Sequence, residues 1–132
     1  MTYTAAKAQC ESDGAFLALP RSDAENDYIR SLIPGSRIWI GINDIDQEGV
    51  FVSVDGRDIT YTKWLSGQPD SYQNNEDGVH ILENEVHNYW NGYWNDLAVG
   101  HSYSFVCSYS LQSKSPLRTN IKLISCSYLC VI

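Results

Sequence analysis

The sequence lacks a long hydrophobic run and has few basic residues. No stretch of 18 apolar residues occurs in the 132 positions, so the sequence predicts no membrane span, and no signal peptide is visible at its start. Nine Lys and Arg stand against sixteen Asp and Glu, which gives a net charge of −7. Nucleic acid is therefore not an expected partner, because binding to phosphates draws on basic side chains.

Patterns typical of catalysis or zinc binding are absent as well. The sequence shows neither a Ser/His/Asp order nor a glycine-rich phosphate loop. His80, His87 and His101 lack the spacing to cysteine that a zinc site requires, and His80 is expected in the core or at its rim. Glu83 and Glu85 could be imagined as a paired acid and base, but strand alternation would put them on one face as ordinary surface charges. We therefore expect no enzymatic activity.

What the sequence contains indicates one loop-rich domain with a substantial core. Its hydrophobic fraction is 43%, with four Trp, nine Tyr and nine Gly. Helical spacing predicts a first helix over Thr2 to Asp13 that carries Cys10 on its inner face. A capping box of Ser22 and Glu25 predicts a second helix, which ends at Pro34-Gly35.

Strand patterns follow the two predicted helices. A segment rich in turn-forming residues, 66–75, interrupts them and is predicted to be a long loop. From 110 to 132 the composition shifts towards Ser, Lys, Pro and Thr, which predicts a disordered tail. The predicted strands cover 38–42, 51–54, 59–64, 79–82, 93–94 and 103–109.

Four cysteines are present. Cys10 and Cys107 either form a disulfide in an oxidising compartment or stay as buried free thiols. The disulfide would close a loop of about a hundred residues, worth about 4 to 5 kcal/mol in the chain-entropy model. Cys126 and Cys130 either tether a partner chain or belong to a disordered tail or a misread gene end.

Oxygen donors gather in the predicted loops. Eleven of the sixteen acids lie between Asp44 and Asp96, with only Arg57 and Lys63 as basic residues in that stretch. Mixed carboxylate and amide oxygens suit Ca²⁺, whereas zinc prefers Cys or His. A cis bond before Pro69 would turn both neighbouring side chains towards one point. The candidate calcium ligands are Gln68, Asp70, Glu76, Asn95 and Asp96.

At these residues the chain resembles the C-type lectin family, in the family's order. The resemblance covers 1–109 and implies an α+β fold, in which two helices flank antiparallel sheets and a long loop binds calcium. It also implies that a first strand and a secretory segment precede Met1, so we expect a secreted or extracellular protein. The matching elements are the first helix with Cys10, Trp39-Ile40-Gly41-Ile42, Gln68-Pro69-Asp70, Glu76-Asp77, Trp94-Asn95-Asp96 and Phe105-Val106-Cys107.

The resemblance implies that the five candidate ligands hold Ca²⁺, with the backbone carbonyl of Asp96 as a further ligand. Two vicinal sugar hydroxyls would complete the coordination. In the family, an amide followed by a carboxylate around the proline goes with galactose, and Gln68 and Asp70 have this order. We therefore expect glycans with terminal galactose or N-acetylgalactosamine as partners. Tyr72 either stacks on the sugar or is an exposed loop residue.

The family's second calcium site would use Asp44, Glu48, Glu76 and Asp77. Ser71 occupies one further ligand position, which is usually Asp, so this site should be weaker. The alternative is that Asp44 and Glu48 are solvated turn residues.

Two departures from the family pattern affect the loop. The inner disulfide is missing, because Gly78 and the region of Val99 or Gly100 lack its cysteines, so the loop should depend more on calcium. Residues 83–91 also form a longer segment than is usual, which could extend or crowd the site.

The alternative function is a module that recognises protein, mineral or ice, with structural calcium only. A single sugar site would bind at about millimolar strength, so useful avidity needs several copies.

Overall fold

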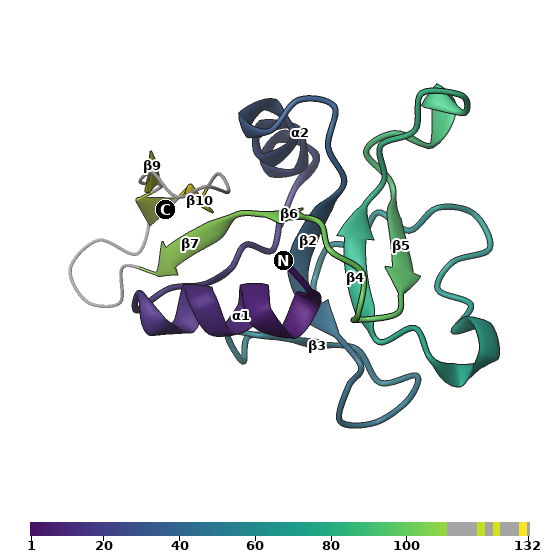
Figure 1. The fold of residues 1–132 in the computed structure, drawn as a ribbon, viewed down its shortest axis with the longest axis horizontal. Coiled ribbons are helices and arrows are strands. Elements are labelled where there is room, and N and C mark those ends of the chain that lie inside the picture. Colours follow the sequence, from purple (N-terminus) through teal and green to yellow (C-terminus); the bar gives the residue numbers. More distant parts are fainter. Residues whose placement is uncertain (111–118, 121–122, 125–129, 132) are drawn as a thin grey trace.

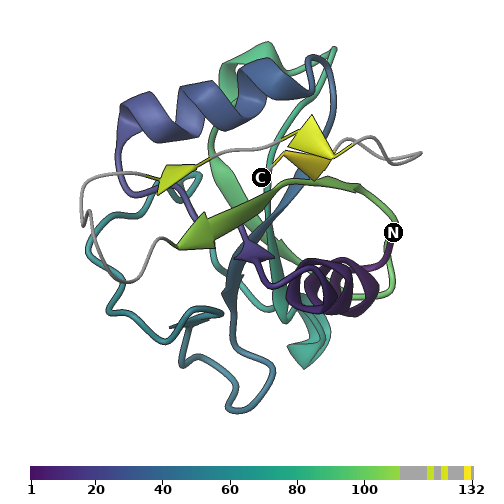
Figure 2. The same ribbon diagram turned by 90° about the vertical axis from the view of Figure 1, so that its left-hand side faces the viewer.

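A computed structural model describes residues 1–110, 119–120, 123–124 and 130–131. Its two α-helices lie on opposite sides of the strands β2 (Ile38–Asn43) and β7 (Cys107–Ser110), as Figures 1 and 2 show. The predicted α+β class is confirmed, and neither described helix is long and apolar enough to cross a membrane.

Both predicted helices form nearly as expected. Helix α1 (Tyr3–Ser12) begins after Thr2, whose hydroxyl accepts from the Ala5 amide. Helix α2 (Asp23–Leu32) begins after Ser22, whose hydroxyl accepts from the Glu25 amide at 3.1 Å. The capping residues thus fix where each helix starts.

The main sheet has the strand order β3-β2-β4-β5, and β6 pairs with β2 in parallel. Its antiparallel centre pairs β2 with β4 (Gly78–Ile81) and β4 with β5 (Trp94–Leu97). Strands β3 (Val52–Ser53) and β5 stand at the two ends of this order, and β6 spans Ser104–Phe105. The register between β2 and β4 shifts between Ile40 and Asn43.

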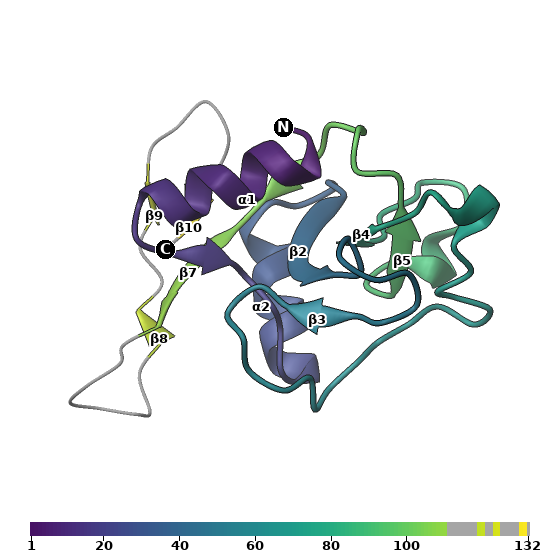
Figure 3. The ribbon, with the colours of Figure 1, turned by 90° about the horizontal axis from the view of Figure 1, so that it is seen from below.

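A second sheet joins β1 (Phe16–Leu17), β7 and β8 (Thr119–Asn120), and Figure 3 shows β7 passing beside α1. A disulfide between Cys10 and Cys107 ties α1 to β7 across 97 positions. The pairing is therefore confirmed, and the alternative of free thiols is wrong.

Two strand predictions needed correction, and one strand was missed. The predicted strand 103–109 is divided into β6 and β7, because the chain changes sheets at Val106, whose carbonyl accepts from Ala18. Strand β1 was not predicted. The described residues 59–64 contain an isolated bridge at Trp64 but no strand, and the side chains of Tyr61 and Lys63 bond to Asp23 at the start of α2.

Most of the predicted tail lies outside the described residues, including Cys126. The described part contains β8, β9 (Leu123–Ile124) and β10 (Cys130–Val131), of which β10 pairs with β9. Disorder of the tail and the roles of Cys126 and Cys130 stay untested predictions.

The core packs in two clusters, one around Trp39 under α1 and one around Trp94 under α2. His80 is fully buried in the core, as predicted, beside the rings of Trp39 and Tyr103. Burial and the nearby Arg37 lower the pKa of His80 to about 3, so its ring is neutral at pH 7.

Candidate metal and sugar site

Three of the predicted ligands converge at one point beside β5. One carboxylate oxygen each from Asp70, Glu76 and Asp96 lies within 4.8 Å of the others. Asp70 and Glu76 come from the long loop before β4, and Asp96 comes from β5. We refer to these three residues as the first acidic cluster.

Buried Asp96 organises the loop around this cluster. Its two carboxylate oxygens accept from the backbone amides of Asp70 at 3.1 Å and Ser71 at 2.7 Å. Glu76 accepts from the amide of Tyr72 at 3.0 Å, where the short 3-10 helix η1 (Tyr72–Asn74) begins. The loop backbone is thus held by the same carboxylates that form the cluster.

The two predicted amide ligands are close in sequence to cluster residues. Gln68 precedes a cis peptide bond to Pro69, and its side-chain NH₂ donates to Asp70 at 3.4 Å. The side-chain oxygen of Gln68 is buried and has no hydrogen-bond partner. Asn95 is half-buried, pairs with His80 across the sheet and directly precedes Asp96.

The electrostatics of the first cluster favour a cation. Burial, together with the neighbouring Asp70 and Asp96, raises the pKa of Glu76 to about 7. Three close carboxylates and an unpartnered amide oxygen form a set of hard oxygen donors, which Ca²⁺ prefers. The residues present therefore fit calcium.

Asp44, Glu48 and Asp77 form a second acidic cluster, whose carboxylate oxygens also lie within 4.8 Å of one another. Asp44 is buried; one of its oxygens accepts from the Gly49 amide at 2.8 Å and the other has no partner. Burial and the nearby Glu48 and Asp77 raise the pKa of Asp44 to about 6. Asp44 is therefore not the solvated turn residue of the alternative interpretation, while Glu48 is exposed.

Ser71 connects the two clusters. Its amide donates to Asp96 in the first cluster, and its hydroxyl donates to Glu48 in the second. This hydroxyl lowers the pKa of Glu48. Glu76, which was predicted for both sites, has its carboxylate in the first cluster.

Tyr3 is buried on α1 and contacts three segments that adjoin cluster residues. Its hydroxyl donates to the carbonyl of Ile42 at 3.1 Å and accepts from the Asn43 amide group at 3.3 Å. Its backbone amide donates to Val99 at 3.0 Å. A Cβ on Gly78 would lie 3.0 Å from the Tyr3 ring. The buried ring thus fills the space beside Gly78, where the family's inner cysteine would stand.

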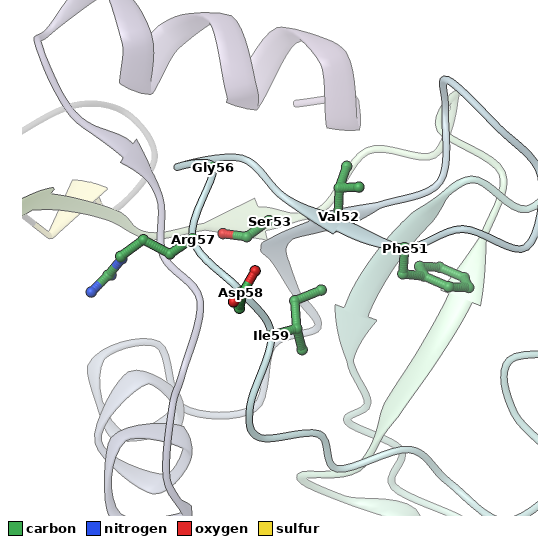
Figure 4. A pocket seen from close by; sticks show the side chains of 7 residues that line it. All are labelled: Phe51, Val52, Ser53, Gly56, Arg57, Asp58 and Ile59. Carbon is green, nitrogen blue, oxygen red and sulfur yellow. The ribbon is translucent and has the colours of Figure 1, made fainter.

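A separate cavity of about 500 Å³ lies at the turn after β3 (Figure 4). Phe51 and Ile59 line it, and Arg57 points away from them. Arg57 is paired with Asp55 at 2.7 Å. None of the residues that line this cavity belongs to either acidic cluster.

Comparison with known proteins agrees with this geometry. The family model of the lectin C-type domain matches residues 1–109. A mannose-binding protein of Gallus gallus is 37% identical over 101 residues, which are 76% of this chain and 37% of that protein. The chain thus spans well under half of that relative.

Solved structures show the same fold. The C-type lectin CEL-I from Cucumaria echinata has a TM-score of 0.69 and 29% identity, with 80% of both chains covered. The carbohydrate-recognition domain of the mouse scavenger receptor C-type lectin has a TM-score of 0.67 and 28% identity, with 79% of this chain and 78% of that chain covered. On the match over residues 1–109, this chain belongs to the C-type lectin family.

Proposed function

We propose that this domain binds Ca²⁺ through the first acidic cluster with Gln68 and Asn95, and binds a galactose-type sugar at the same place. The convergence of Asp70, Glu76 and Asp96 within 4.8 Å is the observation that carries the proposal. The matching family model is that of a lectin domain, which supports carbohydrate binding without catalysis. The bound ion would supply open coordination positions for two vicinal sugar hydroxyls.

Each residue of the site then has a defined task. The carboxylates of Asp70 and Glu76 accept hydrogen bonds from the sugar hydroxyls, and the amides of Gln68 and Asn95 donate to them. Asp96 is already bonded to the loop backbone, so it positions the loop as well. Tyr72 is 66% exposed at the start of η1, and we propose that it stacks on the apolar face of the sugar.

The choice of galactose rests on the order of amide and carboxylate at Gln68 and Asp70. The Gallus gallus relative is named for mannose binding, which makes mannose the competing candidate. The two sugars differ in the hydroxyls that they offer, so the partner of each hydroxyl decides between them. Glycans that end in galactose or N-acetylgalactosamine are the proposed ligands.

The second acidic cluster is proposed as a weaker calcium site, formed by Asp44, Glu48 and Asp77 with the Ser71 hydroxyl nearby. The unpartnered oxygen of Asp44 supports this assignment. An ion there would stabilise the loop and leave the sugar contacts to the first cluster. Since Ser71 bonds to both clusters, occupancy of one should favour the other.

An extracellular location accords with the family, the relative and the disulfide. One such site binds a monosaccharide at about millimolar strength, so we propose that several copies act together on a glycan surface.

Retention on galactose and mannose resins tests the proposal, in calcium and in excess chelator. We expect calcium-dependent retention on galactose. Asp70→Asn should abolish it, whereas Asp46→Asn, the same change at an exposed acid outside both clusters, should not. Calcium binding without retention on either resin would favour the alternative, a module for protein, mineral or ice with structural calcium. Stronger retention on mannose would overturn the galactose assignment.

A further inference from the structure

Tyr93 directly precedes β5, the strand that carries Asn95 and Asp96 of the proposed sugar site. Burial alternates along this segment: Trp94 and Asp96 are buried, whereas Asn95 is half-buried and Tyr93 is 40% exposed. Residues two apart in a strand share a face and lie about 7 Å apart. The side chains of Tyr93 and Asn95 therefore lie on the same face of the segment.

The Tyr93 ring is held in place from one side. The Lys63 ammonium lies 5.4 Å from its centroid and pairs with Asp23 at 3.1 Å. The Lys63 carbonyl accepts from Trp94 at 2.7 Å, so the segment that leads to Gln68 runs directly beside β5. The Tyr93 ring is thus packed against a cation on one side and partly exposed, so its position is fixed before a ligand binds.

The long β4–β5 connection borders the same region. The Asn91 side chain joins the two ends of this connection. It accepts from the Asn84 backbone amide at 2.7 Å and donates to the Glu83 carboxylate at 2.9 Å. Arg30 on α2 pairs with Glu83 at 3.3 Å. In Figure 1 this connection projects beyond the start of β5, and the short helix of the long loop lies nearer the other end of that strand. The extension is thus anchored to α2, and it leaves Tyr93 exposed at its base.

We propose that Tyr93 forms a second subsite, which takes the pyranose ring next to the sugar bound at the first acidic cluster. This inference rests on the proposed function. Aromatic rings suit sugars, because a pyranose presents an apolar C–H face while its hydroxyls stay in water. The subsite would take a neutral pyranose, because the contact that Tyr93 offers is with the apolar C–H face of the ring.

The test compares affinities for methyl galactoside with those for disaccharides of galactose linked β1-3, β1-4 or β1-6 to glucose. For the unmodified domain, the best disaccharide should bind about three- to tenfold more tightly than the monosaccharide. Tyr93→Ala should remove this advantage and leave the monosaccharide affinity unchanged. Tyr93→Phe should keep it. Tyr28→Ala is the matched control, since Tyr28 is 46% exposed on α2.

The possible failures are distinguishable. Equal affinity for monosaccharide and disaccharides, or an advantage that survives Tyr93→Ala, overturns the subsite alone. Equal losses for both sugars in Tyr93→Ala would show a structural role and would also overturn it. If the unmodified domain binds neither sugar in calcium, the proposed function fails together with the subsite.

Discussion

Removing the hydroxyl of Tyr3 should weaken both the fold and calcium binding. Burial raises the pKa of this hydroxyl above its usual range, so it stays protonated and donates to Ile42. Tyr3→Phe leaves the Ile42 carbonyl and the Asn43 amide group without this partner in a buried site. An unsatisfied buried polar group costs about 1 to 3 kcal/mol, and we expect the free energy of unfolding to fall by that amount.

Calcium affinity should fall as well, because the lost bonds adjoin Asp44 and the ring adjoins Gly78, which follows Asp77. Urea unfolding in chelator gives the loss of stability, and calcium titration gives the loss of affinity. Tyr109→Phe is the matched control: its hydroxyl donates to Asp13 at 2.7 Å, away from both clusters. Unchanged stability, or a calcium affinity equal to that of the control, would refute the positioning role of Tyr3.

Three further predictions concern the ion and the sugar. Calcium at about 5 mM should raise the melting temperature more than magnesium does, since extracellular sites bind calcium at about 0.1 to 1 mM. A melting temperature in calcium equal to that in chelator would contradict this prediction. In chelator, the folded-state pKa values of Glu76 near 7 and Asp44 near 6 exceed unfolded values of about 4, so the folded state holds more protons. Stability without calcium should therefore fall as pH rises from 5 to 8, and calcium affinity should rise. Urea unfolding and calcium titration at both pH values measure these changes. A stability that rises with pH, or a calcium affinity that falls, would count against the prediction. The double change Gln68→Glu with Asp70→Asn should shift resin preference from galactose towards mannose, while the total charge of the calcium ligands stays the same. Tyr72→Ala should weaken galactose binding by about 1 kcal/mol without any gain in mannose binding. A double variant that keeps calcium and the parental sugar ranking would show that the order of amide and carboxylate does not select the sugar.

Local signals in the sequence were sufficient for much of the fold. Ser22 and Glu25 placed the start of α2, because a capping hydroxyl acts within a single turn. The family motif brought Asp70, Glu76 and Asp96 together, although 26 positions separate the first from the last. The disulfide between Cys10 and Cys107, expected for an oxidising compartment, is present as well.

Features that depend on distant contacts could not be predicted in this way. Strand β1 has two residues and is defined by its pairing with β7, so no periodicity marks it. The division of 103–109 depends on the bond from Ala18 to Val106. No local pattern marks the role of Tyr3, because its hydroxyl partners lie about forty positions away. The absence of a cysteine at Gly78 was visible in the sequence, but the ring that fills its place was not.

The most direct test of the central claim is a calorimetric titration of calcium into the domain, alone and in saturating galactose. If the sugar coordinates the ion at the first acidic cluster, galactose must tighten calcium binding by the same factor by which calcium tightens galactose binding. We expect a lower calcium dissociation constant in galactose, and a smaller change in mannose at the same concentration. A calcium isotherm that is identical with and without galactose would contradict the claim.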